Sequence, residues 1–176
     1  MKRTLSLLCI VVLAACGKAS ETAAEKMIEA QVSKDGTQAK VDMSGGGMKI
    51  TTTDASGKVS QMEMGTAKVS EADIGLPFYP GTQPKEGEMT RISAPEGSMA
   101  TVILHSDDAP DKVAAFYRDK MKAASAGKQF TDMNTGGTHM LMMGDDQNKQ
   151  FTQVTVSKNE SKGSDIQIAA NKGTPK

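Results

Sequence analysis

Cys16 is the residue whose type and surroundings most clearly predict chemistry in this sequence. It follows the small pair Ala14-Ala15, with Leu13 three positions before it. The chain opens with the basic run Met1-Lys2-Arg3, and an apolar stretch follows that is too short to span a bilayer as a mature helix. A basic start, a short apolar stretch and small residues are typical of a cleaved export signal. The sequence therefore predicts export, with a nucleophilic thiol next to the cleavage position.

The run Leu13-Ala14-Ala15-Cys16 resembles the lipobox of bacterial lipoprotein signals. This resemblance implies that the Cys16 thiolate takes a diacylglycerol through a thioether and that cleavage falls between Ala15 and Cys16. It also implies that the new amino terminus is acylated, so membrane lipid becomes a partner through Cys16. The second mature residue is Gly17 and not the aspartate that signals retention in the inner membrane. We therefore expect an outer-membrane location facing the periplasm.

Methionine is the second residue type that could do chemistry. There are 13 in the chain, and His139 is followed by Met140 and Met142. Thioethers are soft ligands that suit Cu(I), so a small-ligand or Cu(I)-binding protein using Met and His side chains is one alternative. The other is that methionine fills a core that has no Trp and few other aromatic residues. The methionines are scattered along the chain, which favours packing.

Other candidate sites do not complete a motif. Ser125 and Lys128 have the spacing of a serine-lysine acyl-enzyme pair, but they fall at the expected end of a helix and not at its start. His105 and His139 are the only histidines, which excludes a multi-histidine zinc site. Asp145-Asp146 lacks the glycine and distal glutamate of a calcium loop. The sequence predicts no catalytic residue, no metal site, no cofactor and no enzyme activity.

Charge and cysteine content narrow the classes of function further. The chain has 21 basic and 21 acidic residues, and loss of Lys2 and Arg3 with the signal leaves 19 − 21 = −2. Neither a basic cluster nor a second long apolar run is present, which argues against nucleic-acid binding and against a spanning helix. Cys9 lies in the signal and Cys16 carries the lipid, so we expect no disulfide in the mature chain.

Alternating side chains and turn residues predict the secondary structure. A helix is expected over Glu21–Val32, begun by Ser20 or Thr22, and a second over the residues after Asp107-Asp108, with an aspartate as its cap. Phe78-Tyr79, between two prolines, predicts a rigid connector whose aromatic pair either packs or recognises a partner. Strands are expected at 37–43, 48–53, 58–64, 88–94, 99–105, 129–133, 138–144, 149–158 and 164–171.

These elements predict an α+β fold. It begins with an N-terminal helix and a short antiparallel meander, followed by an antiparallel sheet with one amphipathic helix packed on one face, in the order ββαβββ. The expected segments are a signal peptide at 1–15, a lipidated tether at 16–20, a helix plus meander at 21–70, a proline-rich connector at 71–87, an α+β domain at 88–172 and a disordered tail at 173–176.

With these segments placed, the chain resembles a group of bacterial envelope lipoproteins of unknown function. The likeness rests on Cys16, on the run Leu76-Pro77-Phe78-Tyr79-Pro80-Gly81, and on residues 104–113 with Phe116-Tyr117 one turn further along. It implies an architecture and a location, and no activity. We therefore expect a non-enzymatic binding or scaffolding module at the cell envelope, where an exposed sheet edge adds a strand of an envelope protein.

Overall fold

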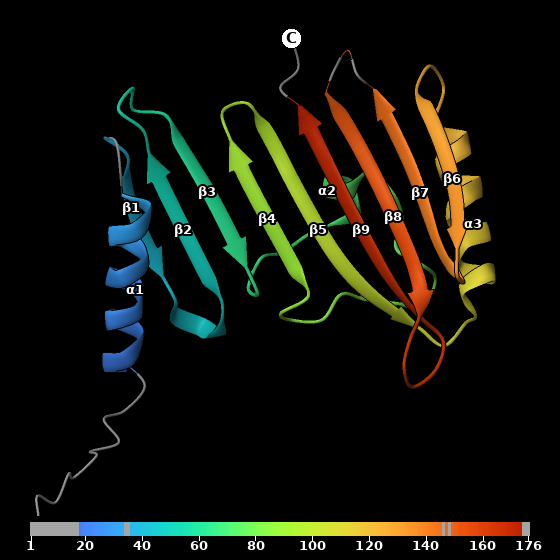
Figure 1. Ribbon diagram of the computed structural model, residues 1–176, viewed down its shortest axis with the longest axis horizontal. Coiled ribbons are helices and arrows are strands. Elements are labelled where there is room, and N and C mark those ends of the chain that lie inside the picture. Colours follow the sequence, from blue (N-terminus) through green and yellow to red (C-terminus); the bar gives the residue numbers. More distant parts are fainter. Residues whose placement is uncertain (1–17, 34–35, 146, 148, 174–176) are drawn as a thin grey trace, which may run out of the picture.

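The computed structural model describes residues 18–33, 36–145, 147 and 149–173. Within them, nine strands form one antiparallel sheet in the order β1-β2-β3-β4-β5-β9-β8-β7-β6 (Figure 1). The strands are β1 (Gln38–Asp42), β2 (Met48–Thr53), β3 (Val59–Met64), β4 (Met89–Ala94), β5 (Gly97–Ser106), β6 (Gln129–Thr135), β7 (Thr138–Asp145), β8 (Gln150–Lys158) and β9 (Ser164–Gly173). The helices are α1 (Lys18–Val32), α2 (Glu71–Ile74) and α3 (Pro110–Ala124), with a short 3-10 turn at Ser44–Gly46.

The expected architecture, a helix with a short meander followed by a ββαβββ sheet, is wrong. The last strand of the meander, β3, pairs with the first strand after the connector, β4, in the register Met64↔Thr90. Four strands follow α3, and the last of them, β9, returns to pair with β5. In two separate sheets, β3 and β4 would each present a row of unpaired backbone groups. Pairing the two strands satisfies those groups and makes one sheet.

Two helix starts also differ from the sequence expectation. α1 begins at Lys18, ahead of Ser20 and Thr22, so neither residue is its cap. α3 begins at Pro110, and its cap position is occupied by Ala109, whose side chain makes no capping hydrogen bond. Neither Asp107 nor Asp108 therefore caps α3. The described helices include none long and apolar enough to cross a membrane.

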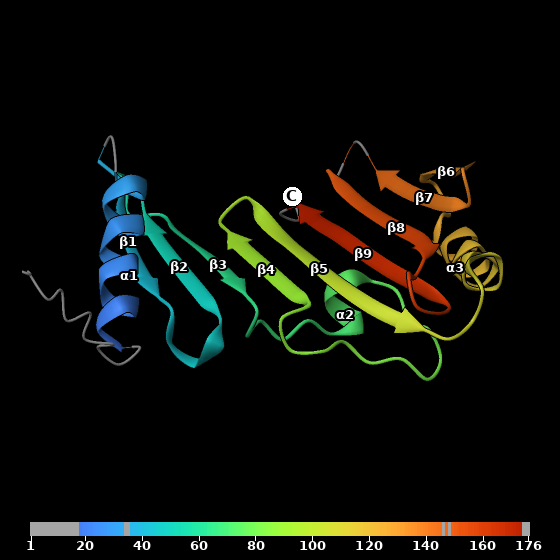
Figure 2. The same ribbon diagram turned by 60° about the horizontal axis from the view of Figure 1, so that its bottom comes forward.

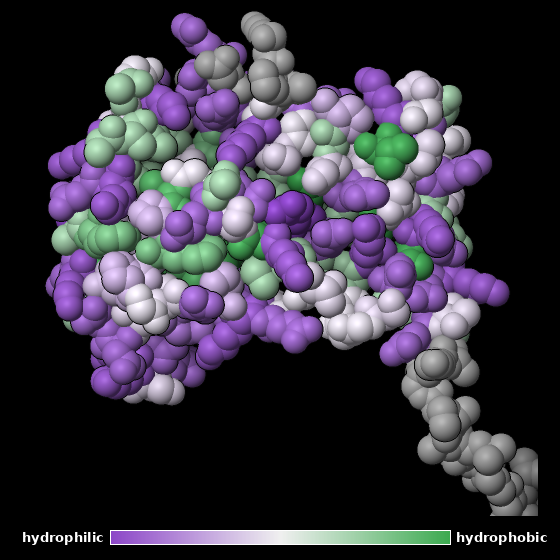
Figure 3. Space-filling model, turned by 180° about the vertical axis from the view of Figure 1, so that it is seen from behind, coloured by the Kyte–Doolittle hydropathy of each residue, from purple (hydrophilic) through white to green (hydrophobic). Residues whose placement is uncertain are grey.

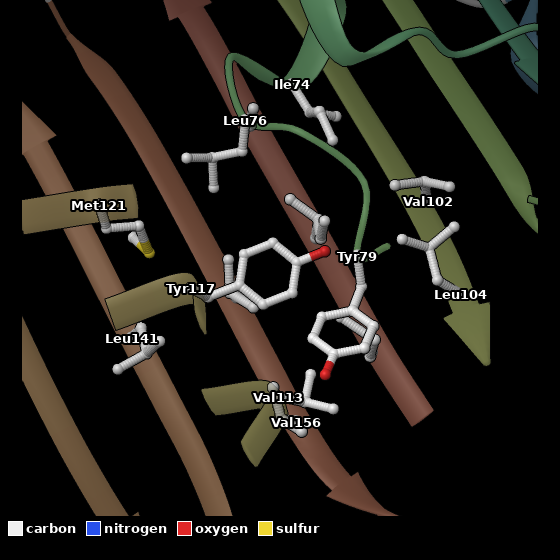
Figure 4. Close-up of a cluster of buried hydrophobic side chains, with 14 of the residues drawn as sticks. Ile74, Leu76, Tyr79, Val102, Leu104, Val113, Tyr117, Met121, Leu141 and Val156 are labelled. Carbon is white, nitrogen blue, oxygen red and sulfur yellow. The ribbon is translucent and has the colours of Figure 1, made fainter. Parts of the chain in front are cut away.

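The main core lies between the back of the sheet and the two helices α2 and α3 (Figures 1 and 2). Leu104, Ile166 and Val156 lie side by side on β5, β9 and β8, and each is fully buried. The Tyr117 ring of α3 packs over these strands next to Tyr79 of the connector (Figure 4). The expected packing role of the aromatic connector is therefore confirmed for Tyr79, which is 6% exposed.

The sheet changes its apolar face between β4 and β5. Side chains in register across neighbouring strands point to the same face. The row through the buried Ala100 on the back of β5 continues into Arg91 and Glu63, so the back of β1–β4 is mostly polar (Figure 3). The row through Met99 on the front continues instead into apolar residues. They are Ile92 on β4, Met62 on β3, Ile50 on β2 and Val41 on β1.

Candidate functional site

A cleft of about 620 Å³ lies at the end of the sheet where β5 stops and β9 begins. Its walls come from the connector, from the link between β5 and α3, and from the β8–β9 turn. Groups of both charges face it, which does not favour a purely anionic or purely cationic ligand. The lining residues are Pro80, Gly81, Thr82, Lys85, His105, Ser106, Asp107, Asp108, Asn159 and Lys162.

His105 lies at the edge of this cleft between two carboxylates. Its Nδ1 is 2.7 Å from Asp165 Oδ1, and its Nε2 is 2.6 Å from Glu88 Oε1. These hydrogen bonds, the one to Glu88 being the stronger cause and the one to Asp165 the second, raise the pKa of His105 above its usual value of 6.5. With both nitrogens engaged by acceptors, the ring has no free lone pair to take a proton from a nucleophile. His105 on β5 is therefore held between Glu88, directly before β4, and Asp165 on β9.

We predict that His105→Gln lowers the free energy of unfolding more at about pH 6 than at about pH 9. A folded-state pKa above the unfolded value of 6.5 gives a stabilisation that is complete below 6.5 and is lost as the pH rises through the folded-state pKa. Because His105 is about one third exposed, we expect only about 1 kcal/mol after solvent screening. Urea denaturation at both pH values measures the difference.

The matched control is Lys49→Gln, which breaks the exposed Lys49–Glu63 ion pair of 2.9 Å. This pair contains no histidine, so the loss for that variant should be the same at both pH values. An equal loss for His105→Gln at both pH values would contradict the proposed titration.

Asp108, which lines the cleft, is connected to the core by two hydrogen bonds. The Tyr79 hydroxyl donates to Asp108 Oδ2 at 2.7 Å, and Ser164 Oγ donates to the Asp108 backbone carbonyl at 2.7 Å. Burial, and secondly the bond to Asp108, raise the pKa of Tyr79 to about 12, so the phenol stays protonated. Lys112, and secondly Tyr79, lower the pKa of the Asp108 carboxyl. These groups fix the loop geometry.

The serine-lysine pair has no catalytic arrangement. Ser125 ends α3, and its Oγ donates to the Lys122 backbone carbonyl at 2.8 Å. The Lys128 contact with Ser125 is made by backbone groups, at 2.8 Å. Serine-lysine enzymes need the lysine amine beside the serine hydroxyl at the start of a buried helix. This pair is a helix terminus.

His139 and its neighbouring methionines lie on opposite faces of β7. The His139 ring points to the back, is 4% exposed, and its Nε2 donates to Asp111 Oδ1 at 2.8 Å. Met140 and Met142 alternate with it and point to the front. The three side chains therefore cannot hold one copper ion. Among the described residues, no group of three or more His, Cys, Asp or Glu is placed to hold a metal.

The β1 edge of the sheet is covered by α1. Every second backbone N–H along β1, and that of Met43 just after it, points away from β2. Two glutamates of α1 and the serine directly after α1 accept three such hydrogens. Four helical residues rise by about 6 Å and two strand residues by about 6.8 Å, so acceptors four apart on the helix match alternate amides. The bonds run from Ala39 N–H to Ser33 Oγ at 3.0 Å, from Val41 N–H to Glu29 Oε1 at 2.8 Å, and from Met43 N–H to Glu25 Oε1 at 2.8 Å.

The β6 edge at the other end of the sheet is open. Thr135 and Thr138 close a two-residue turn whose glycines, Gly136 and Gly137, have φ of 60° and 84°. This geometry makes Thr135 and Thr138 a hydrogen-bonded pair. Hydrogen-bonded and non-hydrogen-bonded positions alternate along the strand, so the residue before Thr135, and every second residue before that one, points its N–H and C=O away from β7. Within the described residues, no side-chain acceptor is hydrogen-bonded to an outward N–H of β6, in contrast to β1. The outward residues are Phe130, Asp132 and Asn134.

The structure describes only some of the site residues that the sequence predicts. Cys16 and Ala15, the lipidation and cleavage residues, lie outside the described residues, as does Asp146. The structure brings Glu88 and Asp165 to His105. No sequence pattern indicates these contacts, because 17 and 60 residues separate the two carboxylates from the histidine. Comparison with known proteins adds nothing, since no family model, curated protein or solved structure matches the chain.

Proposed function

We propose that this protein is a bacterial envelope lipoprotein, held by lipid on Cys16, that binds a partner without enzymatic activity. The lipobox-like run before Cys16 supports the anchor, and Gly17 favours the outer membrane facing the periplasm. The engagement of both His105 nitrogens and the separation of His139 from Met140 support binding over catalysis and over copper handling.

The open β6 edge carries the binding part of this proposal. An edge strand offers a ladder of N–H and C=O groups to an extended segment of another protein. β6 contains no proline and no lysine, the residues that commonly block such pairing. Its side chains are mostly exposed, and Met133 is 43% exposed. The partner we propose is an envelope protein that contributes one extended, proline-free strand.

Photo-crosslinking from β6 tests this function. A photoreactive residue in place of Met133 should give an adduct with one partner in living cells. The control replaces Met27, an equally apolar residue that is 68% exposed on α1 at the covered edge, and should give no such adduct.

A second variant links the adduct to backbone pairing. Asn134→Pro removes an outward N–H while leaving the β6–β7 ladder in place, because proline is tolerated on the free side of an edge strand. Losing about 1 kcal/mol or more should reduce the Met133 adduct by about fivefold or more. An adduct that forms equally from Met27, or that survives Asn134→Pro, would contradict strand addition at β6.

A further inference from the structure

The front of β1–β4 is an uncharged surface. Every side chain that the register places on this face is apolar or a neutral hydroxyl residue. The back of the same strands carries ion pairs, including Lys49–Glu63 at 2.9 Å and Arg91–Asp73 at 2.5 Å. We call six large apolar side chains of this face, five on β2–β4 and one on β5, the front patch. They are Met48, Ile50, Met62, Met64, Ile92 and, on the neighbouring β5, Met99.

The front patch has no cover within the described residues except at its β1 border. α1 packs along β1 and reaches the patch with Val32. An open groove of about 320 Å³ remains beside Val32, and Met64 and Met99 are 39% and 40% exposed. Contiguous apolar surface of this kind marks an interaction site. The groove is lined by Val32, Ile50, Thr52, Ser60, Gln61, Met62 and Ile92.

The start of the described chain indicates what lies against this patch. α1 begins at Lys18, so only Gly17 separates it from Cys16. α1 lies on the front side of the sheet (Figure 1). Glu25, in the first half of α1, accepts a hydrogen bond from the Met43 N–H. Met43 directly follows Asp42, which lies in one row with Lys49 and Glu63, and Met64 is next to Glu63. The first turns of α1 therefore lie beside the end of the sheet that contains Met64. A lipid on Cys16 would thus enter the bilayer next to the front patch.

We infer that the front patch lies on the lipid bilayer to which Cys16 anchors the chain, an inference that rests on the lipoprotein function proposed above. No charge on the patch has to be dehydrated on contact with lipid. Flexible methionine side chains adapt to mobile acyl chains. The anchor holds the patch at a high effective concentration of bilayer, so a weak affinity suffices to keep it there. Strands β1–β4 then face the bilayer, with the ion pairs on their back toward the periplasm.

Single-cysteine labelling of the lipidated protein tests this orientation. Cys9 leaves with the signal and Cys16 carries the lipid, so an introduced cysteine is the only free thiol. Met64→Cys and Thr52→Cys place a polarity-sensitive dye at the two ends of the front face. Val59→Cys places the same dye on the back, since Val59 pairs with Thr53, the neighbour of Thr52. The proteins are reconstituted in phosphatidylcholine vesicles containing a quencher-labelled lipid.

If the front patch is buried at the boundary between headgroups and acyl chains, the dye at Met64 and the dye at Thr52 should both show blue-shifted emission and about twofold or greater quenching. The dye at Val59 should show no change. Quenching at Met64 alone would mean that the molecule stands upright on its tether, and would overturn the inference. A blue shift without lipid quenching would mean that a second copy or another protein covers the patch, and would also overturn it. Protein that does not float with the vesicles would refute the anchor itself, a failure distinct from both.

Discussion

Replacing Cys16 with serine should transfer the protein from the membrane to a soluble or unprocessed pool. A serine hydroxyl does not form the thioether through which the lipid is held. Each methylene buried in the bilayer contributes about 0.8 kcal/mol, so removal of two or three acyl chains leaves no anchor of comparable strength. Membrane fractionation, together with the mass of the amino-terminal peptide, measures the effect. We expect nearly all of the protein to leave the lipid-modified membrane fraction.

Cys9→Ser is the matched control, because it changes the other cysteine of the chain within the apolar stretch. That variant should remain lipidated and membrane-bound. A cleaved but unlipidated Cys16→Ser protein that stays in the membrane fraction would refute the central proposal.

Gly163→Ala should be among the most destabilising single substitutions in the described chain. Gly163 lies in the β8–β9 turn with φ of 76°, a left-handed conformation that costs a residue with a Cβ about 1 to 2 kcal/mol. An added Cβ would also lie 2.8 Å from the Asp107 backbone carbon and closer still to the Ser106 carbonyl oxygen. Both contacts are backbone, which cannot rotate away. We expect a loss of about 3 kcal/mol or more, measured by urea denaturation.

Gly127→Ala separates the two causes. Gly127 has φ of 75°, nearly that of Gly163, but no atom lies within 4 Å of a Cβ placed there. It should lose only the conformational cost of about 1 to 2 kcal/mol. Similar losses for both variants would show that the β8–β9 turn does not press against the backbone of Ser106 and Asp107.

Local structure followed from the sequence, whereas assembly did not. Alternation and flanking turns placed β2 at Met48–Thr53, the bounds that the structure has. The pairing of β3 with β4 was missed because residues 65–88 intervene, and alternation does not specify which strands are neighbours. The change of apolar face between β4 and β5 was not predictable for the same reason, since alternation within one strand does not show which face its neighbours bury.

The candidate site was predictable only where it depends on adjacent residues. His105 and His139 fall within the expected strands 99–105 and 138–144, and they lie on β5 and β7. The partners of His105 come from distant segments, so only the fold reveals them. The cover of β1 has a faint sequence signal, because Glu25 and Glu29 are four apart and precede a strand of period two. Such spacing is also typical of any solvated helix face.

One edge of the sheet, β1, is covered and the other, β6, is open, and this difference limits how many molecules can assemble by strand pairing. Growth of a fibre by strand pairing needs two free edges on each molecule, so that every added copy offers a new site. Here the Glu25, Glu29 and Ser33 side chains occupy the amides of β1. Among the described strands only β6 offers a free edge, so pairing through β6 ends after a single step, whether with a partner or with a second copy. Even when crowded at high density, this protein should form closed pairs and not polymers.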